Sequence, residues 1–261
     1  MKFRPCIDIH NGAVKQIVGG TLSDQRGEAS TNYISEKDAA WYAGKYRKDG
    51  LYGGHVILLN PPSSISYTET KRQALEALRE FPGGLQVGGG ITAENAEEYL
   101  DAGASHVIVT SWVFREGKIL WGRLEELKAV VGKGRIVLDV SCRKKDGKYL
   151  VVTDRWQKFT ETEVNGELLQ SLSGYCDEFL VHGVDVEGKA SGVDEELVRI
   201  LGMWAEKGKM PVTYAGGISS EEDLQILMGA GRNKIDFTVG SALDLFGGSL
   251  SYKNLVEKYG R

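Results

Sequence analysis

The chain has 261 residues, 41% of them hydrophobic and 26% charged, with a net charge of −4. These are the proportions of a globular protein with a large core, and the acidic balance argues against a nucleic-acid-binding protein. Three cysteines, Cys6, Cys142 and Cys176, lack a CxxC pair and favour reduced thiols. No apolar run reaches the roughly 18 residues that span a bilayer, and no targeting segment precedes the first apolar run. We expect a cytoplasmic protein that binds neither nucleic acid nor membrane.

Short apolar runs alternate with amphipathic segments along the whole chain. The runs are rich in Val, Ile or Leu, as strands buried on both faces are, and span 4–9, 55–59, 84–87, 106–109, 136–140, 178–181, 211–214 and 235–239. Helical periodicity covers 71–80, 93–102, 120–131, 194–207 and 220–229. Eight strands, each followed by a helix or a long loop, predict one α/β domain over residues 1–261, a (β/α)8 TIM barrel. A doubly wound open sheet is the alternative.

An internal repeat favours the barrel. The segment GGITAENAEEYLDAGA at 89–104 matches GGISSEEDLQILMGAG at 216–231, an offset of 127 residues. Asp8 in IDI and Asp139 in LDV are 131 residues apart, and Ser111 and Ser241, each ending a small-residue turn, are 130 apart. Matches with nearly one offset predict two half-barrels, approximately 1–131 and 132–261, related by a pseudo-twofold axis.

The two aspartates of the repeat are candidate catalytic residues. Asp8 and Asp139 fall at the ends of strands one and five, which lie opposite each other in an eight-stranded ring, and active sites of barrels form at these strand ends. Each aspartate alone could cap its loop or pair with a lysine. A symmetry-related pair among apolar strand residues favours function, because burying an unpaired carboxylate is costly. The pair suits a reaction in which one proton is removed and another delivered.

The glycine-rich turns of the repeat are candidate phosphate sites. Each turn follows a strand and precedes a helix, where small residues let backbone N–H groups approach an anion. One such pair alone is often only a tight turn. Two pairs, each beside a second small-residue turn, predict a small-molecule substrate with two phosphates. The residues are Gly89, Gly90, Thr110 and Ser111 in the first half and Gly216, Gly217, Gly240 and Ser241 in the second.

Other candidates are less specific. Trp156 lies in a polar segment after strand five, where it could stack on a heterocycle or cover a small satellite core. His182 ends strand six, whereas His55 and His106 open strands and are more often structural. The polar stretch 21–31 is a candidate lid. No spacing of His, Cys and carboxylates typical of a metal site occurs in the sequence.

Four segments together resemble a known family, the phosphoribosylformimino-aminoimidazole-carboxamide ribonucleotide isomerases of histidine biosynthesis. They are CIDIHNGAV at 6–14, QVGGGI at 86–91, YAGGI at 214–218 and GSAL at 240–243. The resemblance covers essentially the whole chain. The segments VTSW at 109–112, LDVSCR at 138–143 and DVEG at 185–188 resemble the form familiar from fungi and plants.

The resemblance implies an Amadori rearrangement of an aminoaldose to an aminoketose, without a cofactor, in a protein that we expect to be a monomer. Asp8 would remove the proton from ribose C2, Asp139 would act as the acid, and Trp156 would be the family's stacking tryptophan. His182 stands where many bacterial members have a threonine, and it would be a substrate-binding residue. Glu187 stands where an aspartate is usual.

Two alternatives remain open from the sequence. The sister barrel of the same pathway, a cyclase that works with a glutaminase, shares the half-barrel repeat, both aspartates and both phosphate sites. It typically has a lysine where this chain has His10, which favours the isomerase. A non-catalytic phosphate-binding barrel is the second alternative. Binding alone would need neither Asp8 nor Asp139, so their presence argues against it.

Overall fold

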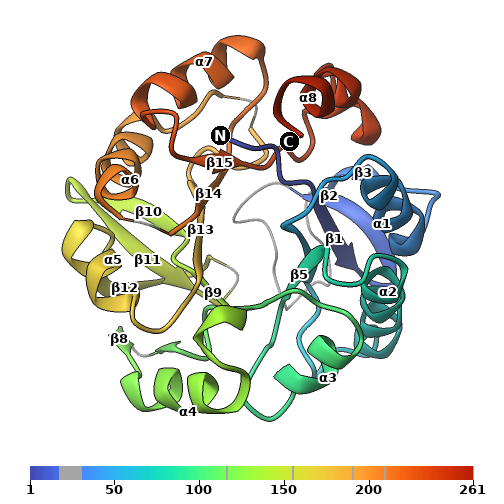
Figure 1. Cartoon of the computed structure of the whole chain (residues 1–261), viewed down its shortest axis with the longest axis horizontal. Coiled ribbons are helices and arrows are strands. Elements are labelled where there is room, and N and C mark those ends of the chain that lie inside the picture. The colour runs from blue at the N-terminus through green and yellow to red at the C-terminus, as the bar shows by residue number, and fades with distance from the viewer. Residues whose placement is uncertain (18–30, 116, 155, 190, 209, 261) are drawn as a thin grey trace.

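The protein is a barrel of parallel strands inside a ring of helices (Figure 1). The computed structural model describes residues 1–17, 31–115, 117–154, 156–189, 191–208 and 210–260. Within them, eight strands pair in parallel in chain order. They are β1 (Cys6–His10), β4 (Gly54–Leu58), β5 (Leu85–Gly88), β6 (Val107–Val109), β9 (Ile136–Asp139), β13 (Glu178–His182), β14 (Val212–Ala215) and β15 (Asp236–Phe237).

The barrel closes between its last strand and the segment that leads into its first. Phe3 forms a parallel bridge with Phe237 of β15. The backbone N–H of Phe237 donates to the carbonyl of Lys2 at 3.0 Å, and that of Arg4 donates to the carbonyl of Phe237 at 2.8 Å. The predicted TIM-barrel fold is therefore confirmed, and each of the eight predicted strands overlaps an observed one.

The helices lie outside the strands and cover the barrel (Figure 1). They are α1 (Ala39–Lys48), α2 (Tyr67–Glu80), α3 (Ala96–Asp101), α4 (Trp121–Val131), α5 (Gly166–Leu172), α6 (Glu195–Lys207), α7 (Glu221–Ala230) and α8 (Tyr252–Tyr259). Polar side chains begin several of them, because they accept hydrogen bonds from first-turn N–H groups. Asp38 caps α1 and Asp194 caps α6, and Ser220 forms a capping box with Asp223 on α7. In the described part of the chain, no helix combines the length and apolar character needed to cross a membrane.

Antiparallel strands extend the barrel after its first and fifth strands. β2 (Ala13–Ile17) and β3 (Thr31–Ile34) continue from β1, and β10 (Cys142–Lys145), β11 (Lys148–Thr153) and β12 (Lys158–Glu163) form a separate sheet after β9. A short pair, β7 (Phe114–Arg115) and β8 (Lys118–Ile119), follows β6. The sequence did not predict these strands. The candidate lid at 21–31 lies, apart from its last residue, outside the described residues.

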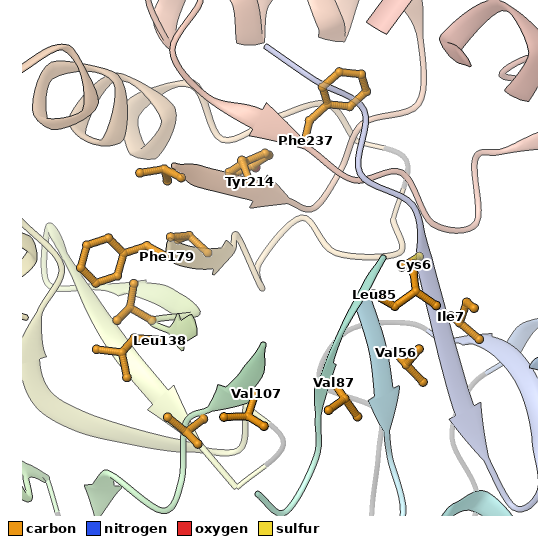
Figure 2. Close-up of a cluster of buried hydrophobic side chains, with 14 of the residues drawn as sticks. Cys6, Ile7, Val56, Leu85, Val87, Val107, Leu138, Phe179, Tyr214 and Phe237 are labelled. Atoms are coloured by element: carbon orange, nitrogen blue, oxygen red, sulfur yellow. The ribbon is translucent and has the colours of Figure 1, made fainter. Parts of the chain in front are cut away.

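The strands bury one face against the helices and the other inside the barrel, because side chains alternate along a strand. The outer cluster includes Ile7, Val56, Val107, Leu138 and Phe179, which Figure 2 shows on β1, β4, β6, β9 and β13. A much smaller inner cluster contains Ile108, Val137 and Leu180, with Ile57 packed against it. The helices are therefore held by the larger, outer core.

A polar layer fills the amino-terminal end of the barrel interior. Glu178, at the start of β13, is 4% exposed and accepts hydrogen bonds from Gln86 at 2.9 Å and Thr213 at 2.7 Å. The Arg4 guanidinium lies 3.3 Å from Glu178 and 2.7 Å from Asp236, at the start of β15. The charged and polar groups of this layer satisfy one another by ion pairs and hydrogen bonds. The carboxyl-terminal end of the barrel is therefore the end where we look for an active site.

Candidate active site

The predicted site residues all lie at the carboxyl-terminal ends of barrel strands or in the segments that follow them. Asp8 is in β1, Asp139 ends β9 and His182 ends β13. The first pair of small-residue turns follows β5 and β6, the second pair follows β14 and β15, and Trp156 lies between β11 and β12. The two pairs of turns therefore lie on opposite sides of the ring of strands, as the repeat predicts.

One cavity at this face gathers half of the predicted residues. Those lining it are Asp8, His182, Gly216, Gly217, Gly240 and Ser241. The others, which belong to the opposite side of the ring, are not among the residues that line this cavity in the described part of the chain; they are Gly89, Gly90, Thr110, Ser111, Asp139 and Trp156. Polar residues that the sequence did not predict also line the cavity: Cys6, Gln16, His55, Glu187 and Thr238.

Two carboxyl groups in the cavity have strongly raised pKa values. Burial raises the pKa of Asp8 to about 7. Burial, and then the nearby charge of Asp8, raises the pKa of Glu187 to about 7. Carboxyl groups with pKa values near neutrality can both give and take a proton under physiological conditions, which is the property that acid-base catalysis requires.

Asp139 is connected to the cavity through Ser141 and His182. The backbone N–H of Ser141 donates to Asp139 Oδ1 at 2.8 Å, and the Ser141 hydroxyl also contacts Oδ1. The same hydroxyl lies 2.9 Å from His182 Nδ1 and accepts from the His182 backbone N–H at 3.2 Å. His182 lines the cavity together with Asp8. Asp139 and Asp8 therefore reach one site by different routes, Asp139 through a hydrogen-bonded chain and Asp8 directly.

Trp156 contacts this hydrogen-bonded chain from the loop that joins β11 and β12. Its ring centroid lies 5.3 Å from that of His182, with 44° between the planes. The neighbouring Asp154 donates its backbone N–H to Ser111 Oγ at 3.0 Å. Residues of this loop therefore contact both His182 and one of the predicted phosphate turns.

The glycine turns of the two halves share positive φ angles. Gly89 and Gly90 have φ values of 101° and 75°, and Gly216 and Gly217 have 122° and 74°. Residues other than glycine rarely adopt these φ angles. A Cβ on Gly216 would also lie 2.8 Å from the carbonyl oxygen of Gly183. The backbone conformation of these turns thus requires glycine. Because glycine has no side chain, the peptide N–H groups are accessible at the rim of the site.

His55 is the histidine whose position departs most from expectation. It opens β4, as a structural histidine would, and is 2% exposed. It nevertheless lines the cavity, and its ring lies 6.3 Å from that of His182. Burial, followed by the effects of His182 and Arg4, lowers the pKa of His55 to about 3. A neutral His55 therefore forms part of the cavity wall.

Residues 2–250 match the family model described as histidine biosynthesis protein. Relatives named 1-(5-phosphoribosyl)-5-((5-phosphoribosylamino)methylideneamino) imidazole-4-carboxamide isomerase match nearly the whole chain. The one from Medicago truncatula, whose name adds chloroplastic, is 54% identical over 98% of this chain and 81% of its own. The one from Yarrowia lipolytica is 48% identical over 98% and 97%, and the one from Saccharomyces cerevisiae is 45% identical over 95% and 94%. Family model and relatives agree with the geometry of the site, and the chain belongs to the histidine biosynthesis protein family.

Proposed function

We propose that this protein is the isomerase for which its relatives are named, and that it works by acid-base catalysis with Asp8 and Asp139. The observation that carries the proposal is the cavity at the carboxyl-terminal face, where Asp8 lies beside a pair of glycine turns and Asp139 is linked through Ser141 and His182. Nearly full-length relatives with this activity in their names support the choice of reaction.

The reaction moves a hydrogen from C2 to C1 of the sugar and needs no oxidant. An acid protonates the ring oxygen, the bond between C1 and that oxygen breaks, and the sugar opens to an imine. A base then removes the proton from C2 to give an enaminol. The enaminol gains a proton at C1 and loses the proton of its C2 hydroxyl, which gives the aminoketose. We assign the base to Asp8, whose raised pKa suits reversible proton transfer near neutrality. We assign the acid to Asp139, on the opposite side of the ring of strands.

The two pairs of small-residue turns would hold the two phosphates of the substrate. The names of the relatives contain two phosphoribosyl groups, which agrees with two anion sites. Gly216, Gly217, Gly240 and Ser241 line the cavity that contains Asp8. Gly89, Gly90, Thr110 and Ser111 would bind the second phosphate across the barrel, with Trp156 stacking on the heterocycle between the two sites.

An ultraviolet assay of the purified protein tests the proposal against the sister cyclase. The substrate of the relatives and, in a separate reaction, the aminoketose are each supplied without a glutaminase, first without and then with ammonia. The products are identified by mass and by their spectra. We expect the aminoketose to form at an unchanged mass, because an isomerisation balances without a second reactant. Turnover that starts only when ammonia is added, with a cyclised product, would instead show a cyclase. Binding without turnover would show a phosphate-binding barrel.

We also propose that the protein works in the cytoplasm. Cys6, Cys142 and Cys176 are all buried and free of disulfides, which suits a reducing compartment. Separation of cell fractions followed by the isomerase assay tests this, and activity confined to an organelle would contradict it.

A further inference from the structure

The hydrogen-bonded chain between Asp139 and His182 carries an inference about substrate recognition that rests on the proposed function. Ser141, its middle residue, is fully buried between the ends of β9 and β10. We propose that Ser141 is a positioning residue that fixes His182 as the tautomer with hydrogen on Nδ1, so that Nε2 accepts a hydrogen bond from a hydroxyl group of the substrate's sugar.

The direction of the chain follows from counting hydrogens. Asp139 Oδ1 accepts the backbone N–H of Ser141 at 2.8 Å, so that oxygen is an acceptor. If Asp139 holds a proton as the acid, the proton belongs on Oδ2. Whether Asp139 is ionised or protonated, the single hydroxyl hydrogen of Ser141 points to Asp139 Oδ1. Ser141 Oγ can therefore only accept hydrogen bonds from its other neighbours.

His182 supplies both hydrogens that Ser141 Oγ accepts. One is its backbone N–H at 3.2 Å, and the other is on the ring nitrogen Nδ1 at 2.9 Å. These two bonds use both lone pairs of the hydroxyl. Burial lowers the pKa of His182, although Asp139 opposes that effect. A neutral imidazole with hydrogen on Nδ1 has a lone pair on Nε2, at the opposite edge of the ring.

The position of His182 indicates which group Nε2 would meet. The residue lines the same cavity as Asp8, for which we propose a role at ribose C2. An acceptor nitrogen is unsuited to an ionised phosphate or a carbonyl oxygen, because neither carries a hydrogen to donate. A sugar hydroxyl carries a hydrogen that it can donate to Nε2. The hydroxyls nearest the reacting carbon are therefore the groups that His182 would recognise, while the ring of Trp156 keeps the imidazole in place.

Nitrogen-15 NMR of the protein labelled at histidine reports the tautomer without any substrate. We expect the His182 signals of wild type to be those of hydrogen on Nδ1, and Ser141→Ala to shift them toward a mixture of tautomers. Ser105→Ala is the matched control, since Ser105 Oγ lies 3.1 Å from His106 Nδ1 outside the cavity. This control should move only the His106 signals. A wild-type His182 with hydrogen on Nε2 overturns the proposal.

Kinetics with the relatives' substrate test whether Ser141 acts through His182. We expect Ser141→Ala and Ser141→Cys to lower kcat/KM about tenfold, as loss of one hydrogen bond does. Cysteine keeps the volume but bonds weakly, so wild-type kinetics in Ser141→Cys would show packing alone and overturn the proposal. Adding Ser141→Ala to His182→Ala should cost little further. Additive losses would show that Ser141 acts on Asp139 alone. If wild type itself does not isomerise the substrate, the proposed function fails, whatever tautomer the spectrum shows.

Discussion

At the scale of single residues, the candidate site contains two carboxyl groups, Asp8 and Glu187, buried where the charged form is unfavourable. Burial raises the pKa of Asp8 to about 7 from 3.8. The folded protein therefore holds a proton on Asp8 that the unfolded chain releases between those pH values. The stabilising contribution of this group is complete below about pH 4 and is lost as the pH rises through 7. Burial of Asp8 therefore lowers the stability of the folded protein at neutral and alkaline pH.

The pH dependence of stability tests whether the pKa of Asp8 is raised in the folded protein. We expect Asp8→Asn to unfold at a higher urea concentration than wild type at pH 8, with a gain of about 1–2 kcal/mol after allowance for solvent screening. The gain should shrink at pH 5, where Asp8 of wild type is protonated. The exposed Glu126→Gln in α4 is the control and should change neither value. An equal effect of Asp8→Asn at both pH values would contradict the raised pKa.

Sequence patterns singled out Asp8 and Asp139 as candidates because a polar residue at the end of an apolar strand is conspicuous. They could not find Ser141 as the partner of His182, because that contact joins two strands 41 residues apart and depends on side-chain rotamers. Gln16 was missed for another reason. It reaches the cavity from β2, an antiparallel strand that the sequence analysis did not predict.

At the scale of elements, buried parallel strands were predictable and antiparallel additions were not. Each barrel strand is a short apolar run, such as the fully buried β6. β10 and β12 contain the polar sequences CRKK and KFTETE with one buried residue each, so they lack that signal. Their pairing partner β11 supplies the buried side chains. A polar strand is stabilised by its neighbour, and its own sequence does not show that neighbour.

The glycine turns offer a matched pair of variants. Gly90 and Gly217 have nearly equal φ values, 75° and 74°. A Cβ on Gly90 would lie 3.6 Å from Pro62, whereas on Gly217 it would overlap the carbonyl oxygen of Gly192. We expect Gly90→Ala to cost about 1–2 kcal/mol from backbone strain alone, and Gly217→Ala to cost clearly more. Urea unfolding of both variants measures the difference. Equal losses would show that the space around Gly217 adjusts freely.

At the scale of the whole molecule, the closing polar layer and the candidate site lie towards opposite ends of the barrel. The polar layer around Arg4 joins the segment before β1 to β13 and β15, across the seam where the barrel closes. The cavity lies towards the other end, at the turns that follow β14 and β15, and reaches into the barrel as far as His55. The half-barrel offset in the sequence predicted the opposed small-residue turns. Phosphate binding by these turns and the division near residue 131 stay predictions from that repeat. The closing layer was not predicted, because its members are far apart in sequence.

Removing the central cation of this layer should weaken the fold and leave the chemistry intact. Arg4→Ala leaves Glu178 without its buried cation, and we expect a loss of about 3–5 kcal/mol in the free energy of unfolding. Arg232→Ala, which breaks an exposed pair with Glu206, should cost about 1 kcal/mol or less. At a temperature where both variants are folded, kcat and KM should match wild type. A large fall in kcat for Arg4→Ala would contradict the separation of the two ends.

The central claim is that Asp8 and Asp139 transfer protons and that binding does not depend on them. Its most direct test measures turnover and substrate affinity together in Asp8→Asn and Asp139→Asn, which keep the shape of each side chain. We expect each variant to lose at least about 10³-fold in kcat, as removal of an acid-base group does, while the Kd for substrate changes less than about tenfold. Turnover near that of wild type in both variants would contradict the two-aspartate mechanism.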